Sequence, residues 1–211
     1  MPKLTLEQLN AKYDELYTFE REYLAKNINN IVGIDEAGRG PLAGPVVAAA
    51  VILDPNVRIL GLDDSKKLTE KKREELFIKI KESALAYSVC RVEADEIDSI
   101  NILNATKKAM RTCVQQLSLK PDVLLIDAVK LEGTGVPVVP IIKGDAKSNS
   151  IAAASILAKV TRDHIMSDYD SVYPGYDFAK HKGYGTKAHY EAIRALGMSP
   201  IHRRTFLKVI H

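Results

Sequence analysis

An eight-residue apolar run over residues 46–53 constrains the fold of this chain more than any other feature. The run reads VVAAAVIL, lies between Pro45 and Pro55, and contains no polar or charged side chain. Small and β-branched residues of this kind are typical of a strand that is buried on both faces. The run is too short for a membrane-spanning helix, which needs roughly 20 apolar residues. We therefore expect a buried strand here.

Four further short apolar runs are expected to be strands, and helical patterns lie between them. The strands are expected at residues 31–34, 87–92, 123–126 and 136–142, and the helices at 69–84, 101–117, 148–169 and 186–196. Thr69 is a candidate N-cap for the first helix, with Leu76, Ile80 and Leu85 on one face. Pro137 and Pro140 place the last strand at a sheet edge. This interleaving predicts an α/β domain with a mixed five-stranded sheet and a helical C-terminal portion.

The first 30 residues are expected to form a short helical appendage and linker, followed by one domain over residues 31–211. Leu9, Leu16 and Phe19 recur at roughly helical spacing within residues 4–24, and residues 27–30 are expected to be a linker. Asp145 precedes the helix expected at 148–169, and a simple N-cap of that helix is one possible role for it.

The composition is that of a globular intracellular protein. Of the 211 residues, 46% are hydrophobic and 27% charged, and the N-terminus lacks the apolar core of a secretion signal. Cys90 and Cys113 are too few for a zinc ribbon and are expected in or near the core. We expect a cytoplasmic protein with no membrane segment, and nothing in the sequence demands more than a monomer.

Positive charge is concentrated at the C-terminal end. The formal net charge is only +3, but residues 173–211 carry seven Lys or Arg against Asp177 and Glu191. The basic residues are at positions 180, 182, 187, 194, 203, 204 and 208. This distribution fits either a polyanion-binding surface or a solvated helical surface, and charge alone does not separate the two.

Acidic residues follow three of the apolar runs. Asp35 and Glu36 follow the first strand, Asp127 follows the 123–126 strand, and Asp145 lies in Lys143-Gly144-Asp145 after the last strand. Converging carboxylates repel one another unless a cation lies between them. Oxygen ligands select Mg²⁺ or Mn²⁺ over zinc, and two such ions can catalyse phosphoryl displacement. A turn or helix-cap role is the alternative for any single acid.

A glycine-rich turn follows the first pair of acids directly. The string DEAGRGPLAGP runs from Asp35 to Pro45, and Gly38-Arg39-Gly40 allows the backbone to approach a ligand closely. The string matches neither the phosphate-binding P-loop nor the dinucleotide fingerprint. A tight turn joining two strands is the alternative, and the adjacent acids favour a functional site.

With this string and the motifs that follow it, the chain resembles the ribonuclease HII family over about residues 31–206. Beyond the first string, the resemblance rests on six further motifs in order. They are DSKKL at 64–68, Ile126-Asp127, Lys143-Gly144-Asp145, SIAAASI at 150–156, and HKGYGT at 181–186 with SPIHRR at 199–204.

The resemblance implies a ribonuclease H-like fold and a set of site residues. It places the four metal-binding carboxylates of the family at Asp35, Glu36, Asp127 and Asp145. It places the turn that reads the ribose 2′-hydroxyl at Gly38, Arg39 and Gly40, and the substrate tyrosine at Tyr184. The 2′-hydroxyl is the group that distinguishes RNA from DNA. Since Arg39 and Tyr184 are present and 30 residues are too few for an extra folded domain, type HII is favoured over type HIII.

The implied activity is hydrolysis on the 5′ side of a ribonucleotide in duplex DNA or at an RNA–DNA junction, and of RNA in RNA–DNA hybrids. Cleavage with two Mn²⁺ or Mg²⁺ ions would leave 3′-hydroxyl and 5′-phosphate ends. The implied roles of this activity are ribonucleotide excision repair and RNA primer removal. Lys66, Lys143, Lys147 and Lys182 either hold phosphates or are solvated surface lysines.

Several expectations concern the C-terminal region. Arg203 and Arg204 are expected to follow the duplex, which predicts an affinity that falls with salt. Because His181 and His189 lack the spacing of zinc ligands, we expect them at the surface or behind the site. Tyr184, between Gly183 and Gly185, is expected to be exposed in a loop.

Two rival functions use the same residues. One is a catalytically silent nucleic-acid-binding domain, which the presence of all four acids disfavours. The other is a structure-specific DNA nuclease or integrase-like transferase with a similar acidic cluster. A DNA enzyme has no 2′-hydroxyl to read, so the glycine-arginine-glycine turn together with Tyr184 disfavours this rival.

Overall fold

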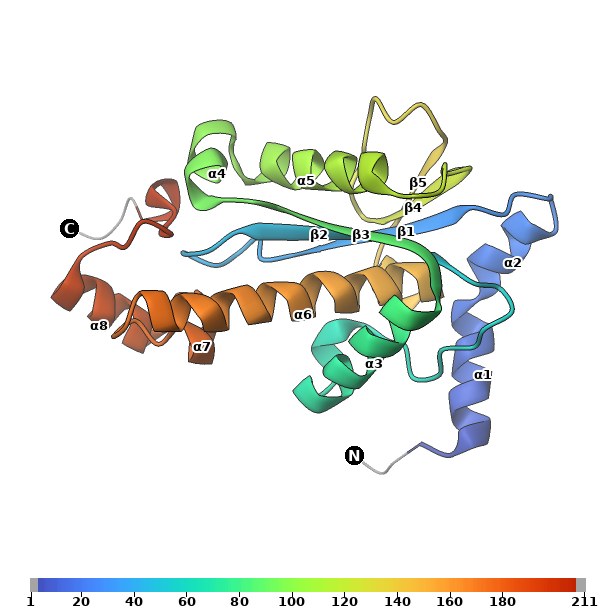
Figure 1. Cartoon of the computed structure of the whole chain (residues 1–211), viewed down its shortest axis with the longest axis horizontal. Helices are drawn as coiled ribbons and strands as arrows, with labels where there is room; N and C mark the ends of the chain where they lie inside the picture. Colours follow the sequence, from blue (N-terminus) through green and yellow to red (C-terminus); the bar gives the residue numbers. More distant parts are fainter. Residues whose placement is uncertain (1–3, 208–211) are drawn as a thin grey trace.

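The computed structural model describes residues 4–207 as a central sheet between two layers of helices (Figure 1). The five strands are β1 (Ile31–Ala37), β2 (Val46–Leu53), β3 (Ala84–Val92), β4 (Val123–Asp127) and β5 (Val138–Ile141). Their spatial order is β3-β2-β1-β4-β5. β1, β2 and β3 pair antiparallel, while β4 and β5 run parallel to β1. The mixed five-stranded α/β sheet is therefore confirmed, with the proline-containing β5 at its edge.

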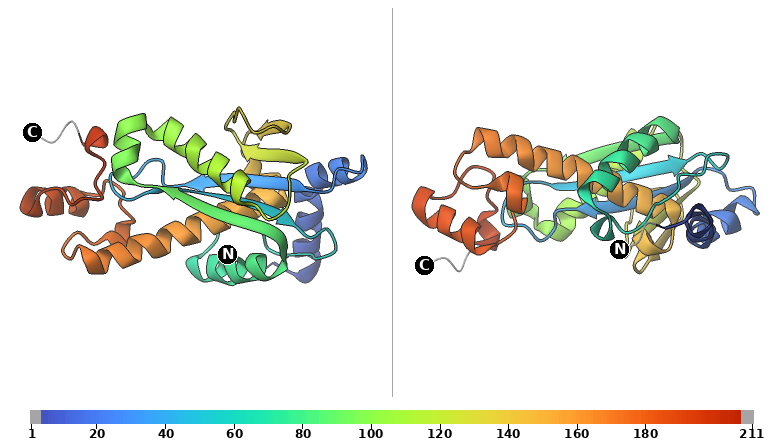
Figure 2. Two further views of the ribbon diagram at one scale, coloured as in Figure 1. Left: turned by 45° about the horizontal axis from the view of Figure 1, so that its top comes forward. Right: turned by 90° about the horizontal axis from the view of Figure 1, so that it is seen from below.

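Eight α-helices are described around this sheet. They are α1 (Leu6–Leu16), α2 (Thr18–Leu24), α3 (Glu70–Ser83), α4 (Ala94–Ile100), α5 (Ile102–Gln116), α6 (Asn149–Val172), α7 (Phe178–His181) and α8 (Lys187–Leu196). Short 3₁₀ turns occur at η1 (Ser65–Lys67), η2 (Gly144–Ala146) and η3 (Arg204–Phe206). In Figure 2, α1 and α2 lie at one end of the molecule, and α7 and α8 lie at the other.

Alternate residues of β2 contribute to two separate cores. Val46, Ala48 and Ala50 pack with residues of α4 and α5, whereas Val47 and Ala49 pack with residues of α3 and α6. All eight residues of β2 are buried, because a strand with helices on both faces has no solvent side. The run that most constrained the fold is thus the central strand of the antiparallel half of the sheet.

A glycine lets α6 lie unusually close to β1. A Cβ at Gly33 would lie 2.0 Å from the carbonyl carbon of Ser150, in the first turn of α6. No side chain fits at this distance, so the strand and the helix backbone are in direct contact. The contact places the N-terminal end of α6 beside the end of β1 that carries Asp35.

The N-terminal helices pack against the same end of α6. Glu20 of α2 is buried and accepts hydrogen bonds from the Ser148 hydroxyl at 2.6 Å and the Ser150 N–H at 2.9 Å. Asn149 donates its side-chain amide to the Tyr13 carbonyl of α1 at 3.0 Å. A carboxylate at a helix N-terminus satisfies free N–H groups and complements the helix dipole. Residues 6–24 therefore support the helix that adjoins the acidic cluster.

Several local expectations were wrong. Residues 4–24 form two helices rather than one, and α4 precedes the predicted helix at 101–117. Leu85 belongs to β3 and is exposed, because α3 ends at Ser83. Both cysteines are buried, as expected. Across residues 4–207, no helix is long and apolar enough to cross a membrane.

Candidate active site

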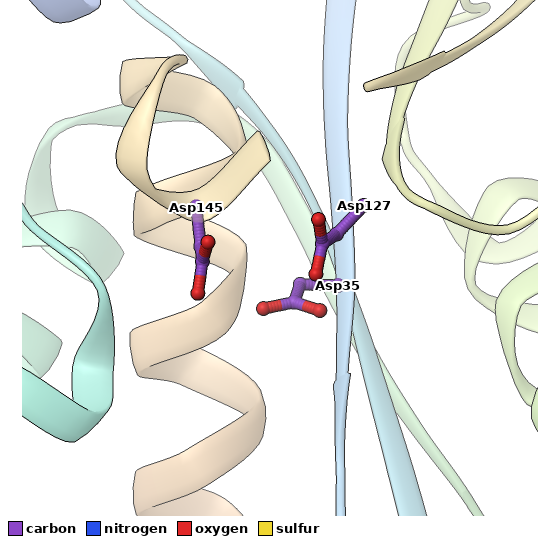
Figure 3. A group of neighbouring side chains, drawn as sticks. All are labelled: Asp35, Asp127 and Asp145. Carbon is purple, nitrogen blue, oxygen red and sulfur yellow. The ribbon is translucent and has the colours of Figure 1, made fainter. Parts of the chain in front are cut away.

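Three aspartates meet where β1 and β4 end and α6 begins. Asp35 lies on β1, Asp127 ends β4, and Asp145 lies in η2 just before α6. One carboxylate oxygen from each residue lies within 4.8 Å of the others, and the side chains point toward a common space (Figure 3). Asp145 does not cap α6, because Ser148 does so through its hydroxyl. The N-cap alternative for Asp145 is therefore wrong.

Strand register explains why two of these acids meet. β1 and β4 are parallel, and Ile34 pairs with Ile126, so the next residues on the two strands are Asp35 and Asp127. Ile34 and Ile126 both belong to the core under α4 and α5. Since side chains alternate between faces, both aspartates project to the α6 face.

Glu36 lies beside this group but not within it. Its carboxylate is 3.3 Å from the Arg39 guanidinium, and its other oxygen, Oε2, is buried with no hydrogen-bond partner in the described chain. Glu36 lines the same cleft as Asp35. The structure thus brings together Asp35, Asp127 and Asp145, and it places Glu36 at their margin.

The acids strongly perturb one another. Burial, followed by the charges of Glu36 and Asp127, raises the pKa of Asp35 well above its usual value. Burial, followed by the charges of Asp64 and Asp127, raises the pKa of Asp145 to about 6. Burial also raises the pKa of Glu36, which the Arg39 charge opposes. A bound cation would offset both the cost of burying these carboxylates and the repulsion between them, so the arrangement favours cation binding.

Asp64 is a fifth acid near the cluster that the sequence analysis gave no role. It caps η1 by accepting a hydrogen bond from the Lys66 N–H at 2.9 Å, and its charge acts on Asp145. The only sequence signal was its place in the DSKKL motif. Asp64 thus both caps a 3₁₀ turn and adds negative charge beside Asp145.

Two buried arginines hold the glycine-rich turn from behind. Arg203 donates to the carbonyl oxygens of Gly38, Arg39 and Gly44 at 2.6 to 3.0 Å. Arg162 donates to the carbonyls of Pro45, Ala43 and Lys182 at 2.9 to 3.1 Å. Both side chains are fully buried. The expectation that Arg203 follows a duplex is therefore wrong, because its guanidinium is enclosed by backbone carbonyls, whereas Arg204 is exposed.

A cleft of about 640 Å³ joins the acids to this turn. Its walls include Asp35, Glu36, Arg39 and Tyr184, and its other lining residues are Ala37, Gly38, Gly40, Ser65, Lys66, Ile102, Ser155, Lys159 and Arg162. Tyr184 is 48% exposed, as expected. A Cβ at Gly40 would lie 3.8 Å from its ring. Ser65, Ser155 and Lys159 were missed, since nothing in the spacing of these residues links them to the acids.

The four candidate lysines do not share one environment. Lys66 lines the cleft. Lys182 instead donates its ammonium group to the Ser167 hydroxyl at 2.9 Å and the Asp163 carbonyl at 3.4 Å, so it is held against α6. Lys143 and Lys147 are exposed at the two ends of η2, outside the residues that line the cleft. Only Lys66 therefore has the position of a direct cleft contact.

The surface alternative for the two histidines was wrong. His181 and His189 are buried, and they form a cluster with buried His202. The rings of His181 and His189 stack at 4.3 Å between centroids, and Phe178 packs edge-on against both. Helical spacing could not reveal this cluster, since its members lie on α7, α8 and the loop after α8.

Solved structures of similar proteins define the class of this fold. The ribonuclease H2 from Pyrococcus horikoshii OT3 is 30% identical, with a TM-score of 0.70 over 83% of this chain and 92% of that one. The RNase HII of a PCNA:RNase HII complex from Archaeoglobus fulgidus is 28% identical, with a TM-score of 0.71 over 85% and 94%. Fold and cleft together define a nuclease of the ribonuclease H class.

Sequence comparison narrows the class to a family. The family model described as Ribonuclease HII matches residues 32–209. A protein named Ribonuclease HII from Clostridioides difficile is 55% identical over 208 residues, covering 97% of this chain and 82% of the relative. The chain belongs to the ribonuclease HII family.

Proposed function

We propose that this chain is an endonuclease that hydrolyses the phosphodiester on the 5′ side of a ribonucleotide embedded in duplex DNA or at an RNA–DNA junction. RNA of RNA–DNA hybrids is a further substrate of the same site. The observation that carries the proposal is a single cleft whose walls hold Asp35 of the acidic cluster, the adjacent Glu36, the Gly38–Gly40 turn and exposed Tyr184. A cleft with this composition supplies both the catalytic group and the means of telling RNA from DNA.

The acidic cluster fits divalent metal ions. Its donors are all carboxylate oxygens, which select hard cations such as Mg²⁺ or Mn²⁺. The unpartnered Oε2 of Glu36 supplies a further buried donor. In this proposal Asp35, Glu36, Asp127 and Asp145 hold two ions. Bound there, the ions would activate water and stabilise the charge on the reacting phosphate, and cleavage would leave 3′-hydroxyl and 5′-phosphate ends.

The turn and the tyrosine account for substrate choice in this proposal. Arg203 binds the carbonyls of Gly38 and Arg39 from the protein interior, and in this proposal the N–H groups at Gly38–Gly40 meet the ribose. The Tyr184 phenol, beside Gly40, contacts the same 2′-hydroxyl. Lys66 and Arg39, on the wall of the cleft, contact phosphates. Ribonucleotide excision repair and RNA primer removal are the processes that need this specificity.

Three labelled duplexes test the proposal: all-DNA, DNA with one ribonucleotide, and a continuous RNA–DNA hybrid. Each is incubated with Mg²⁺, Mn²⁺ or chelator. We expect metal-dependent cleavage on the 5′ side of the single ribonucleotide, with all-DNA intact. Asp35→Asn should abolish this cleavage without unfolding the protein, whereas Asp168→Asn, at an exposed position on α6, should cleave normally.

The outcomes separate the rivals. Cleavage of the hybrid alone would indicate a type HIII or type I specificity and would remove the role of Tyr184. Cleavage of all-DNA would support the DNA nuclease. A protein that binds the duplexes but cleaves none with either metal would be the silent binding domain, and an active Asp35→Asn would rule out the assignment of that carboxylate.

A further inference from the structure

The three buried histidines lie directly behind the loop that carries Tyr184. The Nδ1 atom of His189 is 2.9 Å from the Tyr184 carbonyl, and Nε2 of His189 is 3.0 Å from Nε2 of His202. The Nδ1 atom of His202 accepts from the Ser199 N–H at 2.9 Å. A continuous line of polar contacts therefore runs from Ser199 to the backbone of Tyr184.

These contacts allow only one set of proton positions. His202 must accept at Nδ1, because the Ser199 backbone N–H can only donate, so its proton is on Nε2. That Nε2–H donates to Nε2 of His189, which leaves the His189 proton on Nδ1, facing the Tyr184 carbonyl. By the same reasoning His181 accepts from the Gly183 N–H at Nδ1 and donates from Nε2 to the Tyr176 carbonyl. All three rings are satisfied as neutral imidazoles, each in a fixed tautomer.

We propose that His189 and His202 are positioning residues for Tyr184, forming a relay of hydrogen bonds that fixes the backbone of the tyrosine loop in the cleft. The proposal rests on the proposed function, because the contact of Tyr184 with the ribose is part of that function. Backbone bonds from Tyr184 N–H to the His181 carbonyl and from Thr186 N–H to the Tyr184 carbonyl complete the support.

The relay also joins the tyrosine loop to the glycine-rich turn. The Leu42 N–H donates to the Gly183 carbonyl at 2.8 Å, and Ala43 forms a β-bridge with His202. A shift of the relay therefore moves Tyr184 relative to Gly40, across the part of the cleft assigned to the 2′-hydroxyl. Misplacement of a positioning group by about 1 Å can lower a rate on the order of a hundredfold.

The cluster is not a metal site. Each of its six ring nitrogens already has a partner within the protein, and a metal would have to displace these hydrogen bonds. Burial favours neutral rings: it lowers the pKa of His189, and together with the charge of His189 it lowers the pKa of His202 to about 4. The other charge that acts on both rings is that of His181.

A substitution at His189 with a matched rescue tests the relay. His189→Leu removes the side-chain donor to the Tyr184 carbonyl and leaves the Thr186 N–H as its other donor, with a side chain of similar size in place. His189→Asn returns a donor near the position of Nδ1. We expect kcat on the single-ribonucleotide duplex to fall at least about tenfold in His189→Leu and to recover to within about threefold in His189→Asn. Exposed His164→Leu, on α6, should match the unsubstituted protein.

A double-mutant cycle distinguishes positioning from general loss of structure. In a Tyr184→Phe background, His189→Leu should have little further effect on kcat, because the phenol it positions is gone. Additive losses, or full activity of His189→Leu, would overturn the relay. In either case the unsubstituted protein still cleaves the single-ribonucleotide duplex, so the proposed function stands.

Nitrogen NMR of the imidazole rings tests the relay without any substrate. We expect the Nδ1–H tautomer for His189 and the Nε2–H tautomer for His202 and His181 at pH 7.5. A different tautomer at His189 or His202 would overturn the proposal even if His189→Leu fails to fold. Failure of the unsubstituted protein to cleave would reject the proposed function separately.

Discussion

Gly33 allows the backbones of β1 and α6 to lie in direct contact, whereas Gly40 has no such close backbone neighbour. The two glycines differ in surroundings: a Cβ at Gly33 would meet the Ser150 backbone at 2.0 Å, whereas at Gly40 the nearest group is the Tyr184 ring at 3.8 Å. Backbone of a buried helix cannot move aside as a flexible side chain can.

We predict that Gly33→Ala destabilises the protein by about 3 kcal/mol, a fall in Tm of roughly 10 °C, because β1 must separate from α6. Thermal unfolding followed by circular dichroism measures this. Gly40→Ala serves as the control and should unfold within about 2 °C of the unsubstituted protein. Equal losses in the two variants would contradict the close contact at Gly33.

Among single residues, those that stand out in the sequence pattern could be predicted, and those whose role depends on burial in the fold were missed. The acids could be found because each follows an apolar run, and the exposure of Tyr184 because glycines flank it, whereas the role of Tyr184 came from the family resemblance. Arg203 and His189 looked like members of a basic surface. Their burial depends on packing between α7, α8 and the glycine-rich turn, which no local pattern encodes.

The glycine-rich turn between β1 and β2 is the element most dependent on distant partners. Residues 38–45 contain no helix or strand, and several of their carbonyls are bound by the guanidiniums of Arg162 and Arg203. Burial lowers the pKa of Arg203 and of Arg162, yet both remain protonated at neutral pH, so two cations lie beneath the cleft. A buried cation without hydrogen bonds would be very costly, and the carbonyls offset that cost.

Arg203→Ala should therefore loosen this turn. We predict a loss on the order of 3 kcal/mol in unfolding free energy, since several carbonyls lose their donor, and at least about a tenfold loss of cleavage. Urea unfolding and the single-ribonucleotide assay measure the two effects. Arg204→Ala is the neighbouring control: its exposed side chain should contribute little to stability. If Arg204→Ala proves the more destabilised variant, the carbonyl contacts of Arg203 do not hold the turn.

Secondary structure was predictable where periodicity or capping was strong. Thr69 caps α3, as predicted, and Thr186 caps α8 at the residue where a helix was expected to begin. The break between α1 and α2 and the separate helix α4 were not predicted. Asn101, between α4 and α5, has a positive φ of 66° and caps α5, and such a turn has no unique sequence pattern.

For the whole molecule, the cost of keeping the acidic cluster without metal depends on pH. The folded-state pKa of Asp145 is raised from 3.8 to about 6. A raised carboxyl pKa means that the folded state binds more protons than the unfolded state between these values. Stability from this group is therefore complete below pH 3.8 and is lost as pH rises through about 6.

Asp145→Asn removes this dependence. In chelator, we predict that the variant gains on the order of 1–3 kcal/mol relative to the unsubstituted protein between pH 5 and pH 8. Urea unfolding of both proteins at pH 5 and pH 8 gives the difference in unfolding free energy between them at each pH. The contributions of the histidines cancel in this difference because both proteins contain them. Added Mn²⁺ should stabilise the unsubstituted protein more than the variant at pH 8. A difference independent of pH would mean that Asp145 is not perturbed by its neighbours.

The hydrogen bond from Arg203 to Gly38 joins residues 165 positions apart. During synthesis the glycine-rich turn therefore leaves the ribosome long before Arg203, and Tyr184 and His189 also leave before it. The acids near the turn emerge before the guanidinium that binds its carbonyls. The substrate cleft can take its final shape only after Arg203 has emerged.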